Sequence, residues 1–289
     1  MNQDVMDNKD PFIARFDELL TRLNHWLPDV PPAIDWTAQA FRWRSANGHG
    51  YLQAVAHPHR IGLDDLAAVD QQKQQLFENT RQFVAGRSAN NVLLTGARGT
   101  GKSSLIKAVW QAFRDQDLRL IEVEKVHLVD LPDIIELVYN RPERFIIFCD
   151  DLSFEEGDHG YQALKTVLDG SIAASSSNVL IYATSNRRHL VPEYFSENAA
   201  TRHVGEEVHF ADAVEEKMAL SERFGLWLTF YAMDQDAYLA AAQIWLAKLG
   251  FVRWDETVRH EALQWSRMRG ARSGRVAWQF ARDRAGRLD

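Results

Sequence analysis

A glycine-rich segment near the middle of the chain constrains the fold more than any other sequence feature. Residues 96–103 read Gly-Ala-Arg-Gly-Thr-Gly-Lys-Ser, which matches the pattern GxxxxGK[ST]. The apolar run Val92-Leu93-Leu94 precedes the segment, and an amphipathic stretch from Lys102 to Phe113 follows it. Glycines let backbone N–H groups turn toward an anion, and the dipole of the following helix favours negative charge there. The context predicts a phosphate-binding loop between a buried strand and a helix, in preference to a chance glycine-rich turn.

Two side chains of this loop have the chemistry that a nucleoside triphosphate requires. Lys102 is expected to reach the β- and γ-phosphates, and the Ser103 hydroxyl is expected to bind Mg²⁺. The predicted cofactors are therefore ATP and Mg²⁺. The nucleotide-binding residues predicted in this segment are Gly96, Ala97, Arg98, Gly99, Thr100, Gly101, Lys102, Ser103 and Ser104.

A second apolar run, Phe145 to Phe148, is followed by two carboxylates. We expect Asp150 to hold Mg²⁺ through its water shell and Asp151 to orient or deprotonate the attacking water. Glu155, or its neighbour Glu156, competes with Asp151 for the role of base. A solvated strand end is the alternative interpretation of the acidic pair, but the phosphate loop upstream favours a metal site.

Apolar strand patterns and amphipathic helix patterns alternate from residue 90 to residue 230. Such alternation predicts a parallel sheet covered by helices on both faces. The strand pattern then stops, and three helical segments complete an α/β fold with a helical lid. Strands are expected at 92–94, 118–123, 145–148, 179–183 and 227–230, and helices at 102–113, 131–139, 161–168, 215–224, 237–249, 256–268 and 274–284.

The residues before this alternation carry no recognisable chemistry. Apolar side chains recur at helical spacing from Phe12 to Leu27, and a short strand is expected at Tyr51–Val55 after the turn Asn47-Gly48. The long segment 193–214 has little periodicity. We predict an N-terminal region at 1–59, an α/β nucleotide-binding core at 60–232 and a helical lid at 233–289.

Composition excludes several classes of protein. A hydrophobic share of 46% suffices for a packed core, which excludes disordered and collagen-like chains. No stretch approaches the ~20 apolar residues of a membrane helix. The acidic start of the chain and its one cysteine, Cys149, which is expected to be a buried structural thiol, favour a soluble cytoplasmic protein. The net charge of −7 disfavours nucleic acid, although residues 253–289 hold nine arginines against five acidic residues.

Further motifs resemble those of the AAA+ ATPases. Ala183-Thr184-Ser185-Asn186 is similar to the sensor-1 motif, and Ser221-Glu222-Arg223-Phe224-Gly225 is similar to the arginine-finger segment. Ser273-Gly274-Arg275-Val276-Ala277 resembles the sensor-2 segment, and residues 59–66, which include Ile61, resemble the stretch that packs on adenine.

The resemblance implies a role for each matching residue. Asn186 would position the lytic water, and Arg223 would complete the active site of a neighbouring subunit in a homo-oligomer. Arg275, or its alternate Arg272, would contact the phosphates from the lid. The pair Asp150-Asp151 departs from the commoner Asp-Glu, although replication initiators and helicase loaders share it; the departure leaves the water-activating residue and the hydrolysis rate open.

A closer resemblance is to the bacterial AAA+ family known as domain of unknown function 815. It spans about residues 51–280 and implies an ATP-binding protein, without a cellular role. It is carried by Gly96-ARGTGKSS, Phe148-CDDLSFE, Tyr182-ATSNRRHLVPE, Glu215-EKMALSERFGLWL and Gly270-ARSGRVAWQF.

Taken together, these patterns predict an oligomeric ATPase that remodels or regulates an unknown macromolecular partner, with no membrane association. Three alternatives stay open. The protein could bind ATP as a switch or scaffold with little hydrolysis, or act as a DNA-associated loader-type ATPase. A small-molecule kinase is the third, although it leaves Arg223 and the lid unexplained.

Overall fold

The computed structural model describes residues 33–46, 48–154, 158–170, 177–186 and 220–287, together with a few isolated positions between 13 and 19. Within these ranges the chain forms a seven-stranded sheet with the order β2-β1-β4-β5-β6-β3-β7. The strands are β1 (Ala40–Ala46), β2 (His49–Ala54), β3 (Val92–Gly96), β4 (Leu118–Val123), β5 (Arg144–Cys149), β6 (Val179–Ser185) and β7 (Leu226–Phe230).

All neighbouring strands are parallel except the β1–β2 pair, so the expected α/β class is confirmed. The five strands expected between residues 90 and 230 are β3 to β7, and the short strand expected at Tyr51–Val55 corresponds to β2. Their sequences are apolar on both faces because a parallel sheet is covered on both sides. In β5, for example, every residue from Phe145 to Cys149 is buried.

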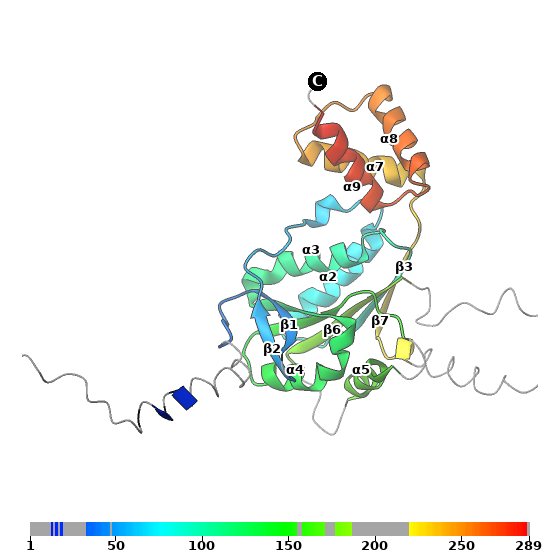
Figure 1. The fold of residues 1–289 in the computed structure, drawn as a ribbon. Coiled ribbons are helices and arrows are strands. Elements are labelled where there is room, and N and C mark those ends of the chain that lie inside the picture. The colour runs from blue at the N-terminus through cyan, green and yellow to red at the C-terminus, as the bar shows by residue number, and fades with distance from the viewer. Residues whose placement is uncertain are drawn as a thin grey trace, which may run out of the picture.

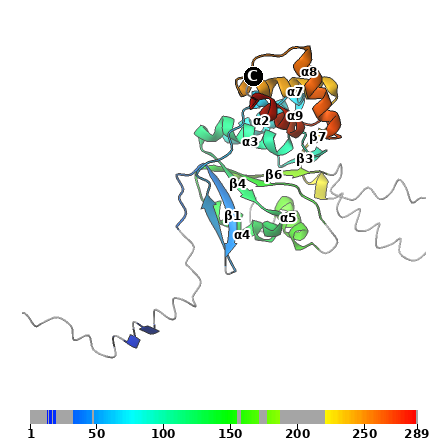
Figure 2. The ribbon, with the colours of Figure 1, turned by 45° about the horizontal axis from the view of Figure 1, so that its top comes forward.

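Helices cover the two faces of the sheet in separate layers, as Figures 1 and 2 show. One apolar cluster joins the sheet to α2 (Asp70–Val84) and α3 (Lys102–Phe113). A second joins the opposite face to α4 (Leu131–Val138) and α5 (His159–Asp169). The phosphate loop lies between β3 and α3, so its position is fixed by a buried strand and a buried helix.

The C-terminal helices form a lid above the α2–α3 layer (Figure 1). They are α7 (Gln235–Lys248), α8 (Glu256–Met268) and α9 (Gly274–Ala285), close to the expected bounds. Each begins at a side-chain cap, because Asp234, Asp255 and Ser273 accept a hydrogen bond from a backbone N–H of the first turn. A separate apolar cluster that includes Tyr238, Ala262 and Phe280 holds the three helices together.

Two elements were not predicted from the sequence. Strand β1 pairs in parallel with β4, and β2 returns antiparallel to β1, so residues 40–54 extend the sheet of the core. Helix α2 has a largely polar sequence, and its buried face includes Asn79 and Thr80. Both bond to the buried Tyr182 hydroxyl on β6, so this helix is attached to the sheet partly by polar contacts that hydrophobic periodicity does not reveal.

Several expected elements lie outside the described residues. They are almost all of the helix from Phe12 to Leu27, the segment 193–214 and the first part of the helix at 215–224. None of the helices in the described ranges is long and apolar enough to cross a membrane.

The buried thiol of Cys149 provides a test of how firmly β5 is held. Burial raises the pKa of this thiol to about 12. Since the thiolate is the reactive form, only about one part in ten thousand is reactive at pH 8. We expect an aromatic disulfide reagent to leave the native protein unmodified at pH 8 and to titrate one thiol per chain in guanidinium chloride. Native labelling at the rate of free glutathione would contradict this packing.

Candidate functional site

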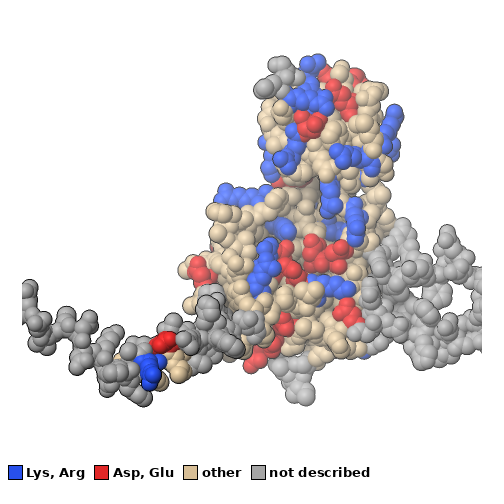
Figure 3. All heavy atoms as spheres, in the orientation of Figure 1, with Lys and Arg blue, Asp and Glu red and all other residues tan. Residues whose placement is uncertain are grey.

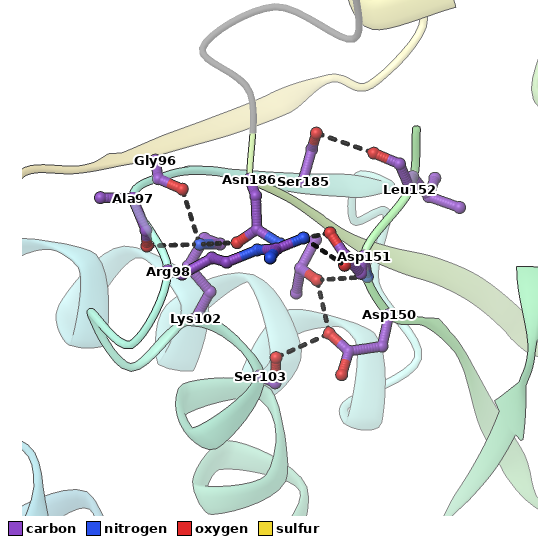
Figure 4. Close-up of polar contacts among 11 residues, drawn as sticks. Gly96, Ala97, Arg98, Lys102, Ser103, Asp150, Asp151, Leu152, Ser185 and Asn186 are labelled. Carbon is purple, nitrogen blue, oxygen red and sulfur yellow. Dashed lines mark hydrogen bonds and ion pairs between the residues drawn. The ribbon is translucent and has the colours of Figure 1, made fainter. Parts of the chain in front are cut away.

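The site lies where three parallel strands end side by side. Strand β6 pairs with β5 on one side and β3 on the other, in registers that align Cys149 with Ala183 and Thr95 with Ser185. The next residues of the three strands therefore emerge at one edge of the sheet. Ligands of open α/β sheets bind at this carboxyl edge. Figure 4 shows Lys102, Asp150, Asp151 and Asn186 gathered there.

The phosphate loop approaches its neighbours closely at Gly96. This residue has a φ of +133°, and a Cβ added to it would lie 2.0 Å from the carbonyl oxygen of Phe230 on β7. Glycine is therefore required both by the backbone angle and by the space available. The loop then turns so that Lys102 is the first residue of α3.

Lys102 is directed back into the loop rather than toward solvent. Its Nζ donates to the carbonyl oxygens of Gly96 at 2.7 Å and Ala97 at 2.8 Å, and to Asn186 Oδ1 at 3.0 Å. Burial lowers the pKa of the Lys102 ammonium, and the nearby carboxylates of Asp150 and Asp151 partly offset this effect. The ammonium is thus held at the sheet edge in a position suited to an anion in the loop.

Asp150 accepts two short hydrogen bonds on a single oxygen. The hydroxyl groups of Ser103 and Thr184 both donate to its Oδ1 at 2.6 Å. Ser103 comes from α3 and Thr184 from β6, so two elements fix the same carboxylate (Figure 4). The contact joins the two residues that the sequence predicts as magnesium ligands.

Asp151 turns away from Asp150 toward the loop. Its φ is +55°, and its carboxylate accepts a hydrogen bond from the Asn186 side-chain amide. Its Oδ2 also lies 3.7 Å from the guanidinium of Arg98, which belongs to the phosphate loop. The predicted base and the predicted water-positioning residue are therefore in direct contact. The pairing of Arg98 with Asp151 was not predicted from the sequence.

A cleft of about 840 Å³ separates this sheet edge from the lid. Asp150, Asp151, Asn186, Arg275 and Ile61 line it. The loop residues that line it are Arg98, Gly99, Thr100, Gly101, Lys102, Ser103 and Ser104. Gly96 and Ala97 do not line the cleft; they act through their carbonyl oxygens on Lys102.

The lid closes the cleft in two ways. At the loop, a Cβ placed on Gly274 at the start of α9 would lie 3.3 Å from the carbonyl oxygen of Gly99. At the other end, Lys248 of α7 forms an ion pair with Asp65, four residues after Ile61. The lid therefore contacts both the phosphate loop and the stretch that contains Ile61.

An aromatic pair on the lid also lines the cleft. The ring centroids of Trp245 on α7 and Trp278 on α9 lie 4.7 Å apart, and the rings are inclined at 60°. Lys248 Nζ lies 5.2 Å from the centroid of Trp245. Sequence reasoning did not identify these residues because tryptophans at helical spacing are usually core residues. No local signal distinguishes a tryptophan at a cleft from one in a core.

Arg223 lies away from the cleft. It precedes β7, whose first residue Leu226 is paired with Val92 at the start of β3. The phosphate loop follows the opposite end of β3. At a rise of ~3.3 Å per strand residue, that end lies about 13 Å from Val92. Here the Arg223 side chain forms an ion pair with Asp169 at the end of α5. The structure therefore does not bring Arg223 together with the other predicted site residues of the same chain.

The family can be assigned from the whole chain. The sequence profile of the family described as "Protein of unknown function (DUF815)" matches residues 36–288. The chain belongs to this family. A comparison with curated proteins finds no match.

Solved structures show the fold that this DUF815 chain adopts. A mutant of Thermotoga maritima RuvB is 15% identical, with a TM-score of 0.51, and the match covers 76% of this chain and 63% of that one. The Thermotoga maritima RuvB Holliday junction branch migration motor is 14% identical, with a TM-score of 0.48 and the same coverage. This chain thus spans less than two thirds of the length of these proteins. At such identities the likeness shows the fold alone, which is the AAA+ P-loop fold.

The residues of this DUF815 chain fit the metal that the AAA+ fold implies. Ser103 and Asp150 offer a hydroxyl and a carboxylate oxygen side by side, and Mg²⁺ prefers oxygen ligands. Among the described residues, no three His, Cys, Asp or Glu side chains gather to hold a metal by themselves. Mg²⁺ usually takes one or two protein ligands and completes its shell with water and phosphates, so the sparse donor set suits it.

Three alternative site residues from the sequence analysis remain. Glu155 and Glu156, the alternative bases, lie outside the described residues. Arg272, the alternate for Arg275, is described and is exposed just before the cap of α9.

The close approach at Gly96 predicts a large effect of a single methyl group. We expect Gly96→Ala to lower the thermal midpoint of unfolding strongly, because the methyl would force β3 and β7 apart as well as strain the backbone. Gly250→Ala is the matched control, since Gly250 also has a positive φ (+83°) but open space around it. There only backbone strain of about 1–2 kcal/mol is expected. Equal midpoints for the two variants in calorimetry would refute the steric argument.

Proposed function

We propose that this protein is an AAA+ ATPase that binds Mg-ATP between its core and its lid. We further propose that it hydrolyses ATP in a homo-oligomer to remodel or regulate a macromolecular partner. The observation that carries the proposal is the meeting of Lys102, Ser103, Asp150, Asp151 and Asn186 at the floor of a cleft that the lid covers. Phosphoryl transfer relies mainly on positioning and charge neutralisation, which is what these groups supply.

The two ends of the cleft match the two ends of a nucleotide. The phosphate loop, with its ammonium at Lys102, suits a triphosphate at one end. Ile61, Trp245 and Trp278 provide an apolar, aromatic surface suited to a base at the other. Arg275 lies near Gly99 at the start of α9, where it would contact the phosphates from the lid.

The polar groups at the floor of the cleft would have different roles in hydrolysis. Ser103 and Asp150 would hold Mg²⁺, which when bound neutralises phosphate charge. Asp151 would accept the proton of the attacking water, while Asn186 orients that water. Lys102 would exchange its present carbonyl partners for phosphate oxygens, and so neutralise charge that develops during transfer.

Arg223 is proposed to act on a neighbouring subunit. Its location at the opposite edge of the sheet from its own phosphate loop supports this assignment, because an arginine so placed cannot contact phosphates in the same chain. An arginine supplied in trans stabilises transition-state charge in other P-loop enzymes. Its ion pair with Asp169 would be exchanged for contact with the neighbour's nucleotide.

Nucleic acid is not part of the proposal. Four lid arginines are neutralised by acidic partners, in the pairs Arg253–Asp255, Arg259–Glu256, Arg284–Glu261 and Arg287–Asp283. On the face shown in Figure 3, acidic side chains are interspersed with the basic ones of the lid. We therefore favour a protein partner, and place the protein in the cytoplasm, whose reducing conditions suit its single free cysteine.

The test is ATP turnover per protomer across a range of protein concentrations with Mg²⁺ present. The rate is expected to rise with concentration, because subunits complete one another's sites. Lys102→Ala and Arg223→Ala are each expected to be inactive alone. An equal mixture should regain activity, since the first supplies the arginine and the second supplies an intact phosphate loop.

Arg253→Ala provides the matched control, because Arg253 pairs with Asp255 on the lid and does not line the cleft. It should leave turnover unchanged. A substantial rate that does not depend on concentration would remove Arg223 from the mechanism. Tight ATP binding without turnover at any concentration would instead favour a nucleotide-dependent switch, and stimulation by DNA would favour a loader-type ATPase.

A further inference from the structure

A threonine of β6 links the two carboxylates that follow β5. Thr184 Oγ1 donates to Asp150 Oδ1 at 2.6 Å and accepts a hydrogen bond from the backbone N–H of Asp151 at 2.9 Å. The residue is 1% exposed at the floor of the cleft, so its hydroxyl is largely shielded from water. A hydroxyl has one hydrogen to donate and lone pairs to accept with. One buried side chain therefore fixes the carboxylate of one aspartate and the backbone of the next.

The backbone contact matters because Asp151 has an unusual conformation. Its φ of +55° is shared by few non-glycine residues of the described ranges, the others being Ala68 and Asp117. Left-handed backbone is tolerated by aspartate but still costs free energy, so it persists where neighbouring contacts enforce it. Thr184 Oγ1 supplies one of these contacts. Another is the hydrogen bond from the Leu152 N–H to the Thr184 carbonyl oxygen at 2.7 Å.

The left-handed turn decides where the Asp151 carboxylate points. The backbone bends at Asp151, and its side chain reaches Asn186 and Arg98, while Asp150 reaches Ser103 (Figure 4). Without the turn, the two adjacent carboxylates would not keep these separate directions. Thr184 thus contributes to the division between a metal-binding carboxylate and a water-activating one.

The carboxylate contact matters for a different reason. Ser103 and Thr184 both donate to Oδ1 of Asp150, so neither of these two hydrogen bonds involves Oδ2. In the proposed function the Ser103 hydroxyl would bind Mg²⁺, and Thr184 would remain as the donor to Asp150 Oδ1. Its position on the buried strand β6 keeps this donor in place whether or not Ser103 moves.

We infer that Thr184 is a positioning residue that orients both Asp150 and Asp151 through its hydroxyl. The inference rests on the proposed ATPase function. Thr184 lies on β6, which is placed in the sheet between β3, the strand before the phosphate loop, and β5, the strand before the acidic pair. The positioning role belongs to its hydroxyl rather than to the bulk of its side chain.

Two substitutions separate the hydroxyl from the shape of the side chain. Thr184→Val keeps the shape and removes the hydroxyl, whereas Thr184→Ser keeps the hydroxyl. We expect Thr184→Val to lower kcat at least tenfold with the KM for ATP within about threefold of wild type, since the phosphate loop is intact. Thr184→Ser is expected to retain kcat within about threefold. Should Thr184→Val not fold, Thr184→Cys, whose thiol is a weak donor, should also lower kcat.

A binding measurement gives a readout independent of turnover. Binding of a fluorescent ATP analogue should be unchanged by Thr184→Val when EDTA is present. The Mg²⁺ concentration needed to enhance binding should rise several-fold in this variant, because Asp150 is less well oriented. Thr184→Ser should follow wild type in both conditions.

The matched control is Thr80→Val. Thr80 is also fully buried, and its hydroxyl bonds to the Leu76 carbonyl and to Tyr182, away from the cleft. The Thr80→Val variant is expected to have a lower thermal midpoint of unfolding, with kcat and the Mg²⁺ requirement unchanged. If Thr184→Val behaves like Thr80→Val, or matches Thr184→Ser, the positioning role is overturned. If the wild-type protein neither binds nor hydrolyses ATP, the proposed function itself fails.

Discussion

The parallel pairing of β3, β6 and β5 is the constraint on which the rest of the structure depends. It brings three loops that are far apart in the sequence to one edge of the sheet, within hydrogen-bonding distance of each other. The same pairing explains the apolar composition of these strands, which are buried on both faces. Since the strands are rigid and buried, the polar groups that follow them are held in place before any ligand arrives. Preorganisation of this kind is what electrostatic catalysis requires.

The polar groups at this edge satisfy one another. Lys102 bonds to Asn186, Asn186 to Asp151, and Thr184 to both aspartates. A buried cation and its neighbouring carboxylates would be costly if left unpaired, so mutual pairing keeps the edge stable. In the proposed function, a triphosphate with its Mg²⁺ would offer acceptors for the Lys102 ammonium and positive charge for the carboxylates.

Sequence alone predicted the parts of the fold that follow local rules. The bounds of α3, β4 and α8 agree with the expected ones because hydrophobic periodicity and loop chemistry are local. Helix α2 and strand β1 were missed, since one buries polar groups and the other is defined by its partner β4. In the site, Lys102, Asp150 and Asn186 were recognisable from motifs. Thr184 was named only as part of the sensor-1-like motif, without a role of its own, and Trp245 was not recognised, because their importance comes from contacts with residues distant in the sequence.

Gly99 of the phosphate loop lies closely against the start of α9. A Cβ on Gly99 would lie 3.0 Å from Ser273 Oγ and 3.4 Å from Arg275 Cβ, and a Cβ on Gly274 would lie 3.3 Å from the Gly99 carbonyl oxygen, so neither glycine leaves room for a side chain. At this point the lid has no room to move closer to the loop. Because close-packed atoms yield little, a change in the loop backbone here would press directly on the first turn of α9.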